Sequence, residues 1–277
     1  RCGRAGSEGF DLTPTDPTAF FSETFEGLLR RVLSWPSRPA VLLLCNIQYA
    51  DGMTMEDAHV RVASHYRIPH VSIRDTIYAR LRNGTLSQES ITPDGLHPND
   101  LGHALVADEI TRVLKRMLKA CPGDLPRDLP CESSLPDPLT ANRFESARRL
   151  TIREISPALA GFRADTAQKT GFLDHFTEGW IGSRTGDRIR FELDELSTLA
   201  VQYRKTIRTP ACVARLSLDG KPALTLDGNF RETWGDCLYM DSILLEHAPA
   251  RHTVELDITD DAGGTATPFY LMSLIVS

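Results

Sequence analysis

Apolar and polar positions alternate between helical and strand patterns in the first half of the chain. Phe20, Phe25 and Val32 fall on a helical spacing that ends before Pro36. The continuous apolar run Ala40–Cys45 is typical of a strand buried on both faces. The pattern then predicts a helix over 55–66, a short strand over 69–73, a helical stretch to about residue 82 and a last helix over 101–119.

This alternation of helices and strands favours a doubly wound α/β domain. Only two strands are visible, whereas such sheets usually contain about five or six. We therefore expect a partial, flavodoxin-like sheet whose first strands are missing from the chain.

The second half of the chain has a period of two. Ile189, Phe191 and Leu193 alternate with charged residues, which is typical of half-buried strands. Asp219 and Gly220 stand between two apolar segments, the usual sequence of a tight hairpin. Short strands with turn signals predict an all-β, jelly-roll-like sandwich. The proline-rich stretch between the halves predicts a linker, so the expected organisation is an α/β domain over 1–120, a linker over 121–150 and a sandwich over 151–277.

Charge and composition argue against nucleic acid and membranes as binding partners. The net charge of −6 provides no field for nucleic acid or an anionic membrane, and no apolar run reaches the roughly 18 residues of a membrane span. The six cysteines have no metal-ligand spacing, so no metal site is expected. No cofactor is expected either. Cys121 and Cys131 are either bridged or free thiols, and compartment and oligomeric state stay open.

The segment from Thr92 to His103 carries the candidate chemistry. Asp94 and His97 are three positions apart on a loop that Pro98 stiffens, and Asn99 or Asp100 is placed to cap the following helix. A carboxylate at this spacing can accept the imidazole Nδ1–H and leave Nε2 free to take a proton from a serine hydroxyl.

This run resembles the last block of the SGNH/GDSL hydrolases, in which Asp-x-x-His is followed by Pro-Asn and Gly-His. The resemblance covers about residues 12–120 and implies a serine esterase that works by acyl transfer, with Asp94 and His97 as catalytic residues. Asn46, at the end of the Ala40–Cys45 strand, is a weaker candidate for substrate binding. A jelly-roll module beside such a domain implies a carbohydrate ester as substrate.

The sequence departs from the family pattern at the nucleophile. The family's Gly-Asp-Ser block is absent, and Ser7 has no room for a strand before it. At the place of the family's Gly-x-Asn-Asp block, residues 9–12 contain no asparagine. Either the first strands are lost by truncation or a misread start, or the chain is a degenerate homologue. In both cases the chain alone is expected to be inactive.

Three functions stay open at this point. The first is a carbohydrate esterase, and the second is a non-catalytic carbohydrate-binding protein with a degenerate hydrolase domain. The third is an interaction module whose sandwich mediates oligomerisation. For the second, four aromatic residues of the sandwich form either a sugar-stacking platform or part of its core: Trp180, Tyr203, Trp234 and Tyr239.

Overall fold

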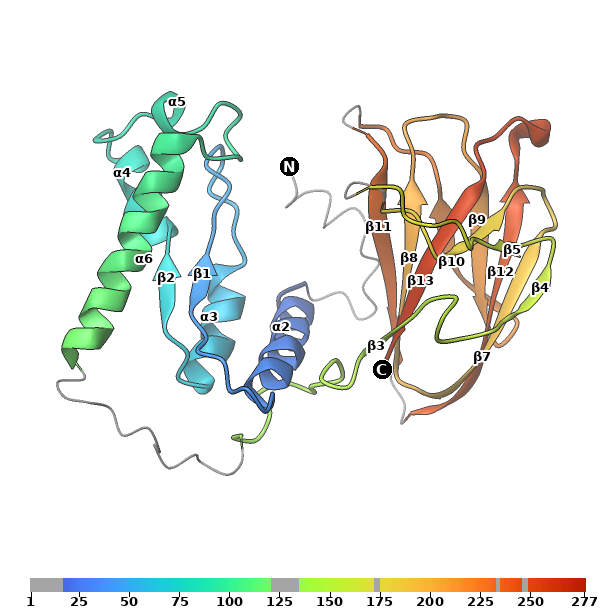
Figure 1. Ribbon diagram of the computed structural model, residues 1–277, viewed down its shortest axis with the longest axis horizontal. Coiled ribbons are helices and arrows are strands. Elements are labelled where there is room, and N and C mark those ends of the chain that lie inside the picture. Colours follow the sequence, from blue (N-terminus) through green and yellow to red (C-terminus); the bar gives the residue numbers. More distant parts are fainter. Residues whose placement is uncertain (1–16, 121–134, 172–174, 233–234, 246–248) are drawn as a thin grey trace. The chain divides into compact units, whose positions relative to one another are not determined.

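The computed structural model describes the chain except residues 1–16, 121–134, 172–174, 233–234 and 246–248. The chain divides into two compact units, with the boundary between Glu145 and Ser146. The first unit is α/β and the second is a β-sandwich, which confirms the predicted fold class (Figure 1). None of the helices in the described ranges has an apolar stretch long enough to span a bilayer.

The α/β unit is built on a pair of short parallel strands. β1 (Leu43–Cys45) and β2 (His70–Ser72) pair with Leu44 opposite Val71. Residues 46–55 form the loop that follows β1. The other elements of this unit are α2 (Pro17–Leu33), α3 (Glu56–His65), η1 (Arg74–Tyr78), α4 (Ala79–Arg82), α5 (Gln88–Ile91) and α6 (Asp100–Ala120).

Helices cover both faces of this strand pair (Figure 1). On one side, Ile73 and Ile91 form a fully buried cluster against Leu105 and Ile110 of α6. On the other side, α2 and α3 meet around Val62 and other buried residues. The apolar stripe of α6 is longer than the pair of three-residue strands can cover, because a helix of 21 residues extends about 30 Å. Apolar residues near its end are accordingly exposed: Leu114, Met117 and Leu118.

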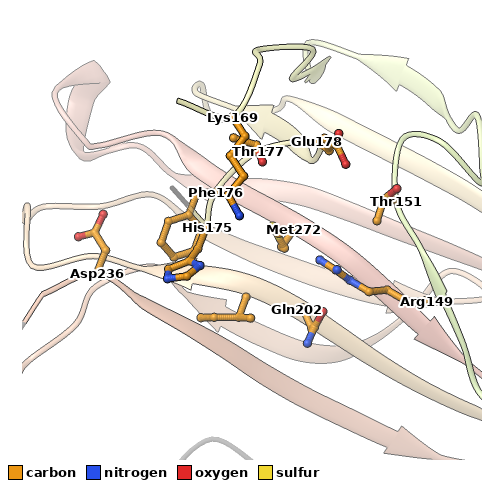
Figure 2. Close-up of a pocket in the computed structure, with 11 residues that line it drawn as sticks. Arg149, Thr151, Lys169, His175, Phe176, Thr177, Glu178, Gln202, Asp236 and Met272 are labelled. Atoms are coloured by element: carbon orange, nitrogen blue, oxygen red, sulfur yellow. The ribbon is translucent and has the colours of Figure 1, made fainter. Parts of the chain in front are cut away.

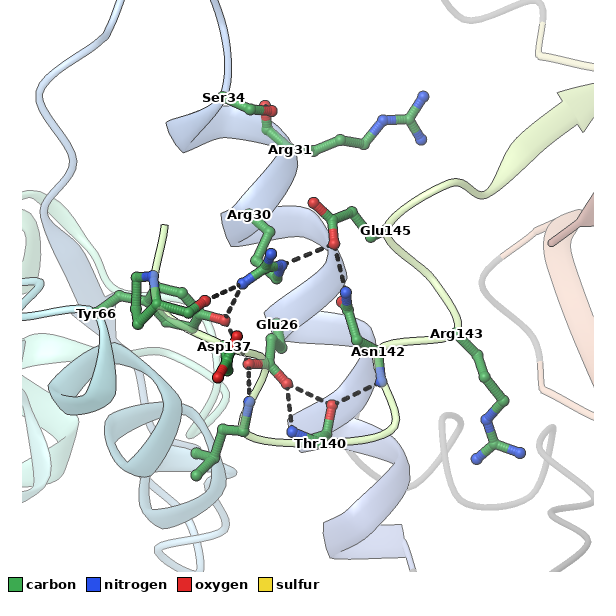
Figure 3. A network of polar contacts seen from close by, with 12 residues as sticks. Glu26, Arg30, Arg31, Ser34, Tyr66, Asp137, Thr140, Asn142, Arg143 and Glu145 are labelled. Carbon is green, nitrogen blue, oxygen red and sulfur yellow. Dashed lines mark hydrogen bonds and ion pairs between the residues drawn. The ribbon is translucent and has the colours of Figure 1, made fainter. Parts of the chain in front are cut away.

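Residues 135–145, which we call the anchoring segment, lie against α2 in the same unit (Figure 3). Glu26 of α2 is fully buried and accepts hydrogen bonds from the backbone N–H groups of Leu139 (2.6 Å) and Thr140 (2.7 Å), and from the hydroxyl groups of Thr140 and Tyr66. These bonds to the charged form hold the pKa of Glu26 below its usual value although burial acts in the opposite direction. Pro136, whose carbonyl accepts a hydrogen bond from Arg30 Nη1 at 2.7 Å, takes part in the same fixed contact.

A second set of ion pairs reinforces this attachment, and Figure 3 shows the pair formed by Arg30 and Glu145. Arg30 of α2 contacts Glu145 at 2.7 Å, and Glu23 receives two hydrogen bonds from the Arg143 guanidinium. All of these partners are more than 100 positions apart in the sequence. The anchoring segment therefore belongs to the α/β unit.

The sandwich consists of two antiparallel sheets. The strand order is β10-β9-β12-β7-β4 in one sheet and β11-β8-β13-β6-β5 in the other, with β3 paired to β13. Its elements are β3 (Arg148–Leu150), β4 (Ala158–Ala160), β5 (Arg163–Ala164), β6 (Trp180–Gly182), β7 (Arg188–Leu196), β8 (Thr198–Lys205), β9 (Val213–Leu218), β10 (Lys221–Asp227), β11 (Cys237–Leu244), β12 (Ala250–Asp260), η2 (Ala262–Gly264) and β13 (Phe269–Val276).

The core between the two sheets follows the predicted alternation. Ile189, Phe191 and Leu193 of β7 all point into it and are nearly or fully buried. Asp219 and Gly220 adopt positive φ angles of 51° and 77° and connect β9 to β10, which confirms the predicted hairpin.

Of the two alternatives left open for the aromatic residues of the sandwich, the structure shows the core and not the sugar-stacking platform for those that are described. Trp180, Tyr203 and Tyr239 are packed into the core, where Tyr203 stacks on Phe269 at 5.5 Å between ring centroids. Trp234 lies outside the described residues. Each of these rings can fill the space between two sheets, which is the commoner use of an aromatic side chain in a sandwich.

Candidate active site

The carboxylate of Asp94 and the imidazole of His97 are in direct contact. Asp94 Oδ2 lies 2.7 Å from His97 Nδ1, so the imidazole donates its Nδ1–H when that nitrogen carries the proton. The other carboxylate oxygen, Oδ1, accepts the backbone N–H groups of Leu96 (2.9 Å) and His97 (2.8 Å). Both oxygens of Asp94 are therefore engaged by the loop that carries the histidine.

This contact changes the acidity of the carboxyl group. The hydrogen bond from His97, followed by the backbone N–H groups of His97 and Leu96, holds the pKa of Asp94 far below its usual value. Asp94 is thus ionised over the whole physiological pH range. An ionised carboxylate at Nδ1 favours the imidazole tautomer whose Nε2 has a free lone pair. Since 73% of the His97 side chain is exposed, Nε2 is accessible to a reactant.

Thr92 and Gly95 shape the turn that carries the pair. Thr92 is buried, and its hydroxyl accepts the N–H of Gly95 at 3.0 Å and contacts Asp94 Oδ1 at 3.3 Å. Gly95 has a φ of +78°, and a Cβ at this position would lie 2.8 Å from the Cβ of Ala50. The positive φ and the close approach both require glycine.

Asn99 joins the turn to the helix that follows. Its side-chain oxygen accepts the N–H of Gly102 at 3.0 Å, and its amide donates to the carbonyl of Ser90 at 3.0 Å. Asn99 thereby acts as the N-cap of α6, as one of the two sequence alternatives proposed. A Cβ on Gly102 would lie only 2.5 Å from the carbonyl oxygen of Ile91, so α6 can approach α5 this closely only with glycine there.

The loop after β1 places the pair at the carboxyl end of the strands. The N–H of Ala50, in that loop, donates to the carbonyl of Gly95 at 2.9 Å. Figure 1 shows α5 and the start of α6 at the same end of the unit as this loop. Ligands of open parallel sheets bind at this end.

Asn46 begins the same loop, and its side chain is exposed. Its backbone carbonyl accepts the Thr54 hydroxyl at 2.9 Å, while its side chain makes no hydrogen bond to any residue that the structure describes. The amide is accordingly available to a ligand, and substrate binding by Asn46 stays a prediction.

Other candidates from the sequence fall elsewhere. Ser7 lies outside the described residues, and so do Cys121 and Cys131. Cys45 and Cys212 are free thiols, and burial raises the pKa of Cys45 to about 11. Over the described parts of the chain, no group of three or more His, Cys, Asp or Glu side chains is arranged to hold a metal ion.

The chain was compared with protein families, curated proteins and solved structures. It matches no protein-family model and no curated protein. Among solved structures it is similar to a two-domain esterase (CEX) active on acetylated mannans, with 40% sequence identity and a TM-score of 0.84 over 95% of this chain and 69% of the other, in a crystal grown with mannopentaose. A second structure of a two-domain esterase (CEX) active on acetylated mannans matches at 39% identity and a TM-score of 0.82, over 95% of this chain and 70% of the other. The chain therefore belongs to the family of two-domain esterases that these structures represent.

Proposed function

We propose that the chain is a carbohydrate esterase of the SGNH type, in which Asp94 and His97 form the acid–base pair. The observation that carries this proposal is the 2.7 Å contact between Asp94 Oδ2 and an exposed imidazole at the carboxyl end of the parallel strands. Membership of the two-domain esterase family supports it.

The geometry suits acyl transfer through an activated serine. Asp94 holds Nδ1–H, and His97 Nε2 takes the proton of the serine hydroxyl while the serine oxygen attacks the ester carbonyl. The resulting oxyanion is stabilised by N–H donors, and His97 returns the proton to the departing sugar hydroxyl as the ester bond breaks. A water molecule then attacks the acyl-enzyme while His97 accepts its proton. His97 returns this proton to the serine oxygen as the acyl–serine bond breaks, which releases the carboxylic acid and restores the serine.

The nucleophilic serine of this mechanism has no candidate among the residues of the chain. The 277 residues contain no Gly-Asp-Ser block. We propose that none of them serves as the nucleophile, so that these residues alone hydrolyse p-nitrophenyl acetate no faster than their His97→Ala variant. A rate from these residues that depends on His97 would overturn this part of the proposal.

For the substrate, we propose acetyl esters of a mannan-type polysaccharide. The similar esterase is described as active on acetylated mannans. The exposed amide of Asn46, at the carboxyl end of β1, is our candidate contact to the sugar.

The decisive experiment measures acetate release from acetylated mannan by the product of the complete open reading frame. We expect release that falls by roughly 10⁴ in the His97→Ala variant and also strongly in Asp94→Asn, since both groups act on the same proton transfer. Glu89→Gln, an exposed carboxylate at the neighbouring α5, is the matched control and should retain full activity. Release that is unaffected by His97→Ala would refute the acid–base role.

A second candidate is a non-catalytic carbohydrate-binding protein, for which the missing Gly-Asp-Ser block is the specific observation. The nucleotide sequence immediately upstream of the Arg1 codon separates the two. An open reading frame that encodes Gly-Asp-Ser there favours the esterase, and its absence together with binding of mannan favours the second candidate.

A further inference from the structure

The carboxylate of Asp94 keeps one oxygen turned towards His97 although both side chains are open to solvent. The exposed fraction is 49% for the Asp94 side chain and 73% for the His97 side chain, so neither is held by burial. Exposed charged pairs gain little from their attraction and lose side-chain entropy when they are kept in one geometry. The direction of the carboxylate therefore depends on what holds its other oxygen, Oδ1.

A threonine hydroxyl is the third donor at Oδ1, beside the backbone N–H groups of Leu96 and His97. Thr92 Oγ1 lies 3.3 Å from Asp94 Oδ1 and 3.0 Å from the backbone nitrogen of Gly95. The Gly95 N–H donates to the hydroxyl, and the single hydroxyl proton is then available to the carboxylate. These groups form a relay of two hydrogen bonds, from Gly95 through Thr92 to Asp94.

Thr92 connects this relay to the core of the α/β unit. Only 3% of the residue is exposed, and it follows the fully buried Ile91 at the end of α5. Its backbone is extended, with a φ of −151° and a ψ of 133°, and its N–H donates to the carbonyl of Gln88 at 3.0 Å. A β-branched side chain has few χ1 rotamers, so the Thr92 hydroxyl has a defined direction.

The Gly95 residue is held at both of its backbone polar groups. Its buried N–H donates to the Thr92 hydroxyl, and its carbonyl accepts the N–H of Ala50 at 2.9 Å. The next two residues, Leu96 and His97, carry the N–H groups that bind Oδ1, so their placement depends on Gly95. Loss of the Thr92 hydroxyl would remove the acceptor of a buried N–H and one donor at Oδ1 together.

We propose that Thr92 is a positioning residue of the acid–base pair: its hydroxyl holds Asp94 Oδ1 so that Oδ2 stays directed at His97 Nδ1. Thr92 acts through Asp94 and does not touch the reacting atoms. Its contribution to catalysis rests on the proposed function, whereas its effect on the pair can be measured without any substrate.

The tautomer of the His97 ring reports directly on the direction of the carboxylate. An Asp94 oxygen at Nδ1 favours the tautomer that carries its proton on Nδ1. Long-range ¹H–¹⁵N NMR spectra of the ¹⁵N-labelled chain distinguish the two tautomers of each of the eight histidines. The spectra are recorded at about pH 9, where an ordinary imidazole is neutral. The signals that disappear in His97→Ala belong to His97.

Variants of Thr92 separate the hydroxyl from the rest of the side chain. In Thr92→Val, which keeps the shape, the ratio of the Nδ1–H to the Nε2–H tautomer of His97 should fall about fivefold, as for the loss of one hydrogen bond. Thr92→Ser keeps the hydroxyl and should retain the native ratio. Thr85→Val is the matched control, because the Thr85 hydroxyl bonds to Asn83 Oδ1 at 2.7 Å in an exposed turn, and it should also retain the ratio.

Amide spectra verify that each variant is folded, and Thr92→Ala carries the same expectation if Thr92→Val does not fold. A threonine that only stabilised the turn would lower the urea midpoint when replaced by valine and leave the tautomer ratio unchanged. That result would overturn the proposal. An equal fall of the ratio in Thr92→Ser and Thr92→Val would overturn it too, because the hydroxyl would then not be the cause.

Acetate release by the product of the complete open reading frame extends the test to catalysis. Thr92→Val should lower kcat about fivefold at an unchanged KM, and Thr92→Ser should restore kcat. Release that does not depend on His97 would refute the esterase proposal and leave the tautomer result standing. Release that depends on His97, with a native tautomer ratio in Thr92→Val, would refute only the role of Thr92.

Discussion

Replacement of Glu26 by glutamine tests how the anchoring segment is held. The carboxylate is fully buried and accepts four hydrogen bonds, one from Tyr66, one from Leu139 and two from Thr140. A glutamine has one acceptor oxygen. If this oxygen keeps the bonds from Tyr66 and Leu139, the new NH₂ group faces the N–H of Thr140, and two donors oppose each other.

The magnitude follows from these contacts. The lost bond to a charged acceptor contributes about 1.5–3 kcal/mol, and the buried N–H left without an acceptor costs about 1–3 kcal/mol more. Glutamine is uncharged, so its burial costs less desolvation free energy than burial of the carboxylate, and this difference offsets part of the loss of stability. We expect Glu26→Gln to reduce the free energy of unfolding of the α/β unit by about 3 kcal/mol.

Urea denaturation followed by far-ultraviolet circular dichroism measures this change, because the α-helices of the described residues all lie in the α/β unit. Glu89→Gln is the control, since Glu89 is exposed and should shift the free energy by less than about 0.5 kcal/mol. A loss in Glu26→Gln no larger than that of the control would refute the reasoning, because it would mean that the four contacts contribute nothing net.

Two further predictions concern the same unit. Gly102→Ala should destabilise the unit by about 2 kcal/mol, because the added Cβ meets the carbonyl of Ile91. Differential scanning calorimetry should show this as a lower melting temperature. An unchanged melting temperature would contradict the close packing of α5 and α6. The pKa of Glu26 is lower in the folded than in the unfolded state, so its stabilisation is present above about pH 4.3 and is lost as the pH falls through the folded value. Urea midpoints measured across this acidic range should therefore fall steeply in the native chain and less so in Glu26→Gln, and parallel profiles would rule out Glu26 as the source.

Sequence patterns predicted the structure correctly where the local periodicity of apolar residues matches their burial in the fold. The alternation of Ile189, Phe191 and Leu193 predicted a half-buried strand, because successive side chains of a strand point to opposite faces. The Asp94–His97 contact was also predictable, since a spacing of three on a stiff turn brings the two side chains together without help from the rest of the fold.

Contacts that depend on tertiary structure were not predictable. The prolines of residues 121–150 are typical of a linker, and nothing local indicates that Thr140 reaches Glu26, 114 positions away. The hydrogen bonds that join Arg149, Ser273 and Gln202 were not predictable for the same reason, because these residues become neighbours only after strands from distant segments pair. Figure 2 shows two of them, Arg149 on β3 and Gln202 on β8. The buried position of Tyr203 shows the converse, since one residue type suits both a core and a binding surface.

The engagement of both oxygens of Asp94 has a mechanical consequence. One oxygen is held by amides of the loop on which the histidine stands, so carboxylate and ring move as one body when that loop moves. The Asp94 carboxylate and the His97 imidazole are therefore ordered once, when the protein folds, and binding of a substrate need not order them again. A small displacement of the turn would therefore misplace the imidazole as a whole while leaving its bond to Asp94 intact.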